Sequence, residues 1–225
     1  MVTKEGTKER LSRDTVVTAA LALADNEGLE TLTIRRLATD LGVTPMALYW
    51  HFKDKERLLD GLSELVLGEM RLPAEEPGQP WTDALRGVLG ELLAVLRAHP
   101  AVTDVVRSRI LACEPGLELT ERVLGILRSA GFTVEQSSQV AVQALITLVG
   151  LVTAEPGVAR AEESEDDHEQ RLRTKKAQLL TLSPKRYPHV VEAAEPLTAC
   201  GSSEEYFTVG LDAVIHGMRG VLSAD

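Results

Sequence analysis

The sequence predicts an all-α fold of about nine or ten helices, arranged as a small N-terminal head and a larger helical body. Apolar residues recur at helical spacing along nearly the whole chain, and no run alternates as a half-buried strand would. Only 4% of the 225 residues are aromatic, and Leu, Ala and Val supply most of the apolar content. That mixture favours helices over sheets. Hydrophobic residues at 44% and charged residues at 26% exclude a disordered or fibrous chain.

The head is expected to hold three helices followed by a linking helix, each opened by a side chain that can cap a first turn. The four predicted N-caps are Ser12, Thr33, Thr44 and Asp54. Gly28 and Gly42 follow the first two helices, where a positive φ commonly ends a helix. Pro45 suits the first position of the third helix because an N–H there would lack a partner. We place the head at residues 1–53 and the linking helix at 54–71.

A Pro- and Gly-containing break at Leu72–Pro80 separates the linking helix from the body, which we place at 72–225. Thr133 and Gln136 form a capping-box pattern that opens a long apolar helix. An acidic stretch from residue 155 is expected to begin as a loop. The expected body helices cover roughly 82–98, a short piece after Pro100, 115–130, 134–154, 170–182 and 203–222.

Residues Ile34–Lys53 have the spacing of a helix-turn-helix unit. Ala38 is small enough for a close helix crossing, Gly42 allows the turn, and Leu48 lies on the buried side of the second helix. A generic helical hairpin is the alternative, but the basic and aromatic residues beside the unit favour the first interpretation. Residues 1–60 carry a net charge of −1 and the remainder −9, so the acidity of the chain lies in the body.

Residues 12–67 resemble the DNA-binding head of the tetracycline-repressor (TetR) family, most clearly in the stretch LTIRRLATDLGVTPMALYWHFKDKERLLDGL. In the body, FTVGLDAVIHGM near the C-terminus and YPHV at Tyr187–Val190 are similar to segments of the tetracycline-repressor branch. The resemblance implies a C-terminal ligand-binding and dimerisation domain. The helices at 134–154 and 203–222 are then candidates for the dimer interface, with ordinary core packing as the alternative.

The resemblance also implies that the third helix enters the major groove of double-stranded DNA. Arg35 resembles the family's base-reading arginine, whose guanidinium suits guanine O6 and N7. Trp50 could instead pack in the head, Arg36 could be a solvated neighbour, and His51 could be incidental. The expected DNA-binding residues are Thr33, Arg35, Arg36, Thr44, Pro45, Met46, Ala47, Tyr49, Trp50, His51 and Lys55.

A small-molecule inducer is expected in the body, and its identity is not encoded in a recognisable motif. Where the tetracycline repressor holds its drug and magnesium with histidines and an asparagine, this chain has Arg71, Val88, Val106 and Arg109, so we do not expect a tetracycline–magnesium inducer. Arg109 would favour a ligand with an acidic or phenolate group, unless it is solvated. The expected ligand-binding residues are Trp81, Val106, Arg109, Val123, Gln143 and Thr147.

The absence of certain motifs and of a long apolar run argues against several other classes of protein. No catalytic or phosphate-binding motif is present, so we do not expect an enzyme. No metal site or cofactor is expected, because Cys113 and Cys200 lack partners and the acidic run Glu162–Glu169 around His168 is typical of a solvated loop. The longest apolar run, Ala144–Ala154, is short for a bilayer span of ~20 residues, and no signal peptide is evident. We expect no membrane partner and a cytoplasmic location.

These observations lead to one main hypothesis. The chain is expected to be a ligand-responsive transcriptional regulator, most simply a repressor that binds a palindromic operator as a homodimer and is released by a small-molecule inducer. The alternative is a DNA-tethered structural or interaction protein that signals through a protein partner. A ligand-sized cavity would favour the first hypothesis, and a filled body with a large exposed apolar patch would favour the second.

Overall fold

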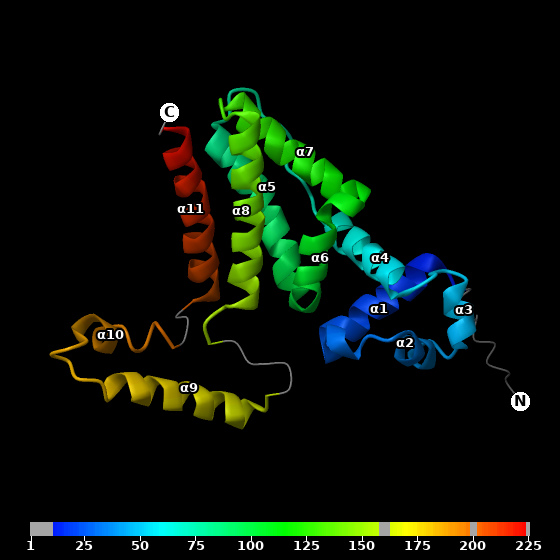
Figure 1. Cartoon of the computed structure of the whole chain (residues 1–225), viewed down its shortest axis with the longest axis horizontal. Coiled ribbons are helices and arrows are strands. Elements are labelled where there is room, and N and C mark those ends of the chain that lie inside the picture. Colours follow the sequence, from blue (N-terminus) through cyan, green and yellow to red (C-terminus); the bar gives the residue numbers. More distant parts are fainter. Residues whose placement is uncertain (1–10, 158–162, 199–201, 224–225) are drawn as a thin grey trace, which may run out of the picture.

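The computed structural model describes residues 11–157, 163–198 and 202–223, and Figure 1 shows the arrangement of their helices. Within these ranges the chain forms eleven α-helices, nine of them with seven or more residues, and no strand. The prediction of an all-α fold is confirmed. The described ranges leave out 158–162, so the loop expected there and Glu162 of the acidic run lie outside them.

The head contains α1 (Arg13–Glu27), α2 (Ile34–Asp40) and α3 (Pro45–Tyr49), and α4 (Lys55–Gly68) links it to the body. All four predicted N-caps are confirmed, since each side-chain oxygen accepts a hydrogen bond from a backbone N–H three residues later. These donor–acceptor distances are 3.1 Å for Ser12, 3.1 Å for Thr33, 3.3 Å for Thr44 and 2.9 Å for Asp54. Gly42 has φ 64°, which lets the chain turn sharply between α2 and α3.

The helix-turn-helix is held by a small apolar core. Ala38 and Leu48 are buried, and both belong to the hydrophobic cluster that includes Val16 and Ala20 of α1. The carbonyl oxygen of Ala38 accepts a hydrogen bond from the N–H of Val43 at 2.9 Å, which fixes the turn. The small residue, the glycine and the leucine therefore occupy the positions that the sequence spacing predicts.

The body is a bundle of α5 (Trp81–Ala98), α6 (Thr103–Arg109), α7 (Glu114–Ser129), α8 (Val134–Thr153) and α11 (Ser203–Leu222), with the 3₁₀ turn η3 (Ile110–Ala112) between α6 and α7. The capping box that opens α8 is confirmed in both directions: Thr133 accepts from the Gln136 N–H, and Gln136 accepts from the Thr133 N–H. Figure 1 shows α8 and α11 side by side and antiparallel, in agreement with their packing.

Two helices extend away from this bundle (Figure 1). They are α9 (Glu165–Leu180) and α10 (Pro188–Glu192), and together with their flanking residues 163–198 we call them the arm. The prediction of a helix at 170–182 placed its start too late. Ser164 caps the helix by accepting from the Asp167 N–H at 3.2 Å, and the acidic residues of the first turn suit the positive end of the helix dipole. No residue of α9 is buried.

α8 is long and apolar enough to cross a membrane by length and composition alone, with a mean hydropathy of 1.2 over its most apolar window. The sequence did not predict this, because its apolar run is interrupted by Ser, Gln and Thr. One such helix is weak evidence for a span, since a core helix of a soluble protein meets the same criterion. α8 packs on α5, α6, α7 and α11, and 28% of that window is buried within the described chain.

Candidate functional sites

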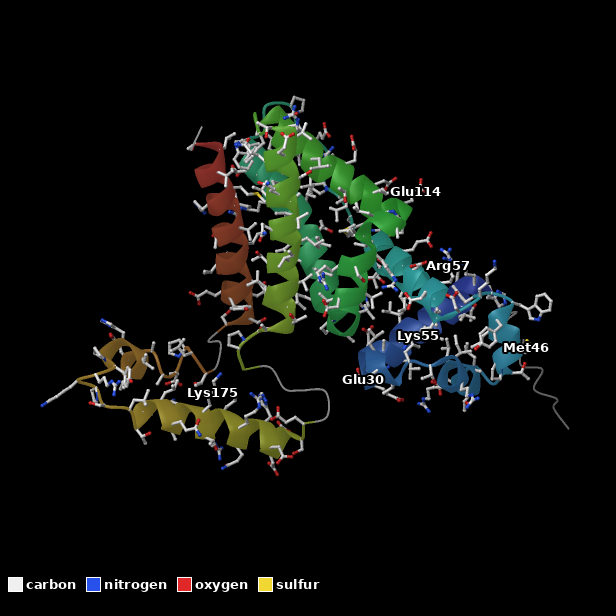
Figure 2. The ribbon with its side chains drawn as sticks, viewed as in Figure 1. Glu30, Met46, Lys55, Arg57, Glu114 and Lys175 are labelled. Carbon is white, nitrogen blue, oxygen red and sulfur yellow. The ribbon has the colours of Figure 1, made fainter. Side chains whose placement is uncertain are left out.

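The outer face of the head carries large apolar side chains that the fold leaves in solvent. Met46, Tyr49 and Trp50 on and just after α3 are 68%, 47% and 86% exposed. Figure 2 shows Met46 on α3, at the end of the head away from the body. The alternative that Trp50 packs in the head is wrong, and Phe52 fills that role with 2% exposure. Such a cluster on a five-residue helix indicates a binding surface rather than a core.

Polar groups flank this surface. The Thr33 and Thr44 hydroxyl oxygens accept the capping hydrogen bonds of α2 and α3, so each hydroxyl proton is still able to donate outward. Arg35 and Lys55 are exposed, and within the described chain neither forms an ion pair. Pro45 is exposed, whereas Ala47 and His51 are half-buried.

Arg36 differs from its neighbour Arg35. Its guanidinium lies 2.6 Å from Glu27 and 3.5 Å from Asp40, so it joins α2 to the end of α1. The three side chains are 35–44% exposed, and such pairs are worth little individually. Arg35 is therefore the arginine of α2 that is free to reach a partner.

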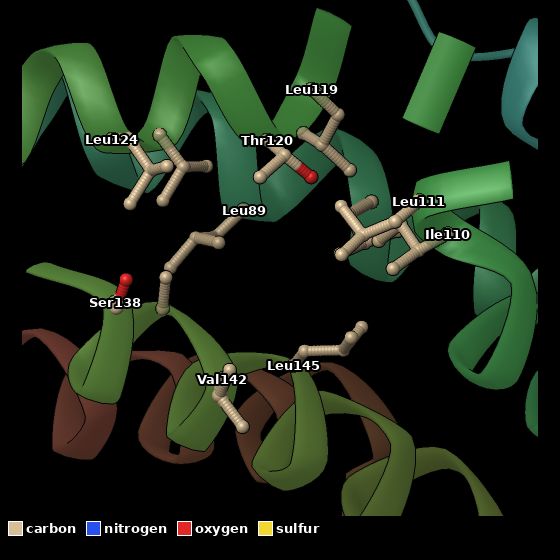
Figure 3. A pocket seen from close by; sticks show the side chains of 12 residues that line it. Leu89, Ile110, Leu111, Leu119, Thr120, Leu124, Ser138, Val142 and Leu145 are labelled. Atoms are coloured by element: carbon tan, nitrogen blue, oxygen red, sulfur yellow. The ribbon is translucent and has the colours of Figure 1, made fainter. Parts of the chain in front are cut away.

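The body contains an apolar cavity of about 240 Å³ between α5, η3, α7 and α8. Figure 3 shows its walls, with Thr120 of α7 and Ser138 of α8 among otherwise aliphatic side chains. None of the residues that line it is charged or aromatic. They are Leu89, Leu92, Ile110, Leu111, Leu119, Thr120, Val123, Leu124, Ser138, Ala141, Val142 and Leu145.

Of the six residues predicted to bind a ligand, Val123 lines this cavity. Val106 is wholly buried, and Trp81 packs edge-on against Phe132 with ring centroids 5.6 Å apart. Gln143 and Thr147 are exposed on α8, on another face of the helix than Ser138 and Ala141. The ligand role of these four stays a prediction, without support from the cavity lining.

Arg109, the sixth, is directed to the linking helix. Its Nε donates to Asp60 at 3.1 Å, and its Nη2 donates to Glu56, so two carboxylates of α4 hold the guanidinium. Arg109 and Asp60 are 16% and 30% exposed, so their pair is stronger than a surface pair, whereas Glu56 is 74% exposed. Because Ile110 and Leu111 follow directly and line the cavity, Arg109 connects the cavity wall to α4.

A second connection joins the body to the head at His99, which ends α5. Its Nδ1 lies 2.7 Å from Asp25 of α1, and its Nε2 lies 3.1 Å from Glu69 at the end of α4. Burial lowers the pKa of His99, but the hydrogen bonds and charges of Asp25 and Glu69 outweigh it and raise the pKa above its usual 6.5. His99 therefore bridges Asp25 of the head and Glu69 of the linking helix.

In the part of the chain that the structure describes, no three His, Cys, Asp or Glu side chains are grouped so that they could hold a metal ion. Val88 and Val106, at two of the positions that align with the drug ligands of the tetracycline repressor, are buried hydrocarbon. Neither valine side chain offers an oxygen or nitrogen ligand to a magnesium ion.

Comparison with known proteins decides the family. Residues 16–62 match the family described as bacterial regulatory proteins, tetR family, and residues 72–222 match the tetracyclin repressor-like C-terminal domain. The chain belongs to the TetR family of transcriptional regulators. It is accordingly a ligand-responsive transcriptional repressor with a helix-turn-helix DNA-binding head, and not an enzyme.

Three relatives show how far the similarity to this TetR-family chain extends. The HTH-type transcriptional repressor DrrR1 of Streptomyces coeruleorubidus is 31% identical, over 95% of this chain and 79% of its own length. The class C tetracycline repressor protein of Escherichia coli is also 31% identical, over 93% of this chain and 91% of its own. The structure of Streptomyces coelicolor ActR in complex with actinorhodin superposes with a TM-score of 0.77, at 26% identity, covering 93% of this chain and 97% of ActR.

Proposed function

We propose that this repressor binds a palindromic operator as a homodimer, with α3 in the major groove, and is released when a small molecule fills the body. The observation that carries the proposal is the exposure of Met46, Tyr49 and Trp50 on and just after α3, together with Arg35 of α2, which is exposed and forms no ion pair with the described residues. Met46 and Ala47 can contact thymine methyl groups, whereas Arg35 can form two hydrogen bonds to one guanine. Threonine hydroxyls, His51 and Lys55 fit phosphate contacts.

The division of the chain supports this proposal. We assign residues 1–53 to the DNA-binding domain, 54–71 to the linking helix and 72–225 to the ligand-binding and dimerisation domain. The cytoplasm, where bacterial DNA is accessible, is then the expected location.

Dimerisation is proposed through the outer faces of α8 and α11. Ile146 of α8 and Val209 of α11 are 48% and 60% exposed, although the two helices pack on each other and on α5. Gly217 and Gly220 of α11 have open space beside them, which would let a second helix approach closely. A twofold dimer presents two heads to two half-sites, which is why a palindrome is expected.

The dimer is tested by measuring the molar mass in solution by light scattering. Val209→Arg is expected to give monomers, because a buried unpaired charge opposes association. Lys175→Ala on α9 is a matched surface control, and it is expected to leave the mass of a dimer unchanged. A monomeric parent protein at micromolar concentration would contradict the proposal.

The operator is tested by selecting genomic fragments with the purified protein and titrating the recovered site at low and moderate salt. Arg35→Ala is expected to weaken operator binding by about 1–3 kcal/mol and to relax the preference at one base pair of each half-site. Lys55→Ala is expected to weaken all sequences alike and to flatten the salt dependence. Equal losses on operator and random DNA for both variants would contradict these roles.

A small-molecule inducer is favoured over a protein partner because the body holds a cavity rather than a filled core. The structure of ActR in complex with actinorhodin, which shares this fold over nearly its full length, favours a small-molecule ligand for this chain as well. If operator binding proves insensitive to every small molecule, the DNA-tethered interaction protein becomes the better description.

A further inference from the structure

The chemistry of the cavity wall restricts the kind of molecule that it can hold. Ten of the twelve lining residues are aliphatic, and α5, η3, α7 and α8 each present hydrocarbon to the cavity, which is partly open to solvent beside Leu111 and Val142. An ionised group seated among these side chains would lose part of its hydration without gaining a counter-charge, which is unfavourable. A cation and an anion are disfavoured for the same reason.

Two arginines directly precede lining residues, and neither alters this conclusion: Arg122, before Val123, is paired with Glu75 and donates to the Pro73 carbonyl oxygen. Arg109 precedes the lining residue Ile110, and the sequence alone suggested that it would favour an acidic ligand. In the structure its guanidinium is held by Asp60 and Glu56 of the linking helix. Its charge is therefore compensated by protein carboxylates, and it offers no free partner to an acidic ligand.

Two hydroxyl groups provide the polar contacts. The Thr120 hydroxyl donates its proton to the Gly116 carbonyl oxygen at 2.8 Å, so towards a ligand it offers only an acceptor. Ser138 is exposed and has no hydrogen bond within the described chain, so its hydroxyl is able to donate or accept. Figure 3 shows the two residues on opposite walls of the cavity.

We propose that this cavity holds a neutral, mainly aliphatic small molecule with a hydroxyl or carbonyl group, and holds it without a metal ion. The proposal rests on the proposed function, in which the cavity is the inducer site. A ligand hydroxyl would donate to Thr120, and a ligand carbonyl would accept from Ser138. The volume of about 240 Å³ lies just below the ~300–1,000 Å³ usual for ligand pockets, so the molecule is small.

The test uses four probes with the same eight-carbon chain: 1-octanol, 2-octanone, octanoate and octylammonium. Each is titrated into the full-length protein at pH 7.5 by isothermal calorimetry, with and without magnesium chloride. The alcohol and the ketone are expected to bind. The affinities of the two ions are expected to be at least about ten-fold lower, because binding them buries a charge. Magnesium is expected to change none of these affinities.

Three variants test whether the alcohol binds in this cavity. Ala141→Phe adds a ring to the lining and is expected to abolish binding of the alcohol, whereas Glu118→Phe adds the same ring to an exposed site on α7 outside the lining. Thr120→Val keeps the shape of the side chain and removes the acceptor. It is expected to lower the affinity for the alcohol about five-fold and the affinity for the ketone by less. Circular dichroism and operator affinity show whether each variant is folded.

The outcomes separate the ligand class from the proposed function. Binding of octanoate or octylammonium as tightly as octanol would overturn the ligand class and leave the inducer cavity in place. Octanol binding that survives Ala141→Phe would overturn the assignment to this cavity. Failure of the parent protein to select an operator would instead contradict the proposed function.

Discussion

Gly116 is the residue at which a single added methyl group would disturb the cavity most directly. It lies in the first turn of α7 and is buried against η3. A Cβ at this position would overlap the carbonyl oxygen of Ile110 and lie 2.8 Å from its carbonyl carbon and 3.2 Å from its Cα, whereas ordinary contacts are 3.4–4 Å. All three atoms belong to the backbone, so no side-chain rotation relieves the overlap. Gly116→Ala therefore has to displace η3, which carries the cavity residues Ile110 and Leu111.

The size of the effect follows from two opposing terms. Overpacking of this kind costs typically about 1–3 kcal/mol, and the better helix propensity of alanine returns roughly 0.5–1 kcal/mol. We expect a net loss of up to about 2.5 kcal/mol for Gly116→Ala, with a midpoint of about 1 kcal/mol. Gly125→Ala is the matched control in the same helix, because no atom lies within 4 Å of its added Cβ, and we expect it to gain roughly 0.5–1 kcal/mol.

The two variants are compared by urea denaturation followed by circular dichroism, and by octanol titration. Gly116→Ala is expected to be the less stable variant and to bind octanol more weakly than the parent. If the two variants were equally stable, the close approach between α7 and η3 would be refuted. If Gly116→Ala were less stable but bound octanol normally, η3 would not control the cavity wall.

Three further changes test contacts described above. The raised pKa of His99 means that its bridge to Asp25 and Glu69 stabilises the fold fully below pH 6.5 and is lost as the pH rises through the folded-state pKa. The unfolding free energy of the parent is expected to decline across that range relative to His99→Gln, and a constant difference between them would contradict the bridge. Arg109→Met is expected to keep operator binding but to raise the octanol concentration needed for release in a mobility-shift assay, and an unchanged midpoint would exclude this coupling. Thr133→Ala is expected to cost about 1 kcal/mol in urea denaturation through loss of the cap of α8, and parent-like stability would count against that contribution.

The features predicted best from the sequence are those that depend on residues close together along the chain. N-caps such as Thr44, with Pro45 beside it, and the turn at Gly42 follow from local backbone chemistry and are found as predicted. The start of α9 was misplaced because acidic residues at a helix N-terminus can be taken for a loop, although Ser164 and Asp167 together carry a capping signal.

Which helix face meets the cavity was beyond prediction from the sequence. α8 is apolar on several faces, so the polar stripe of Gln143 and Thr147 gave no indication that Ser138 and Ala141 would line the cavity instead. The partner of Arg109 was equally hidden, because Asp60 is 49 residues away along the chain. Such long-range pairs are decided by how the helices cross, which local periodicity does not encode.

The two tryptophans of the chain lie in different parts of the molecule and in different surroundings. Trp50 stands 86% exposed on the proposed DNA face, whereas Trp81 is half-buried at the start of α5 against Phe132. Their emission should therefore differ in wavelength and in access to a soluble quencher such as iodide. Quenching of Trp50 should fall when DNA covers it, while the emission of Trp81 reports on the body. With no label added, one fluorescence cell can follow occupancy of the operator and rearrangement of the inducer domain at the same time.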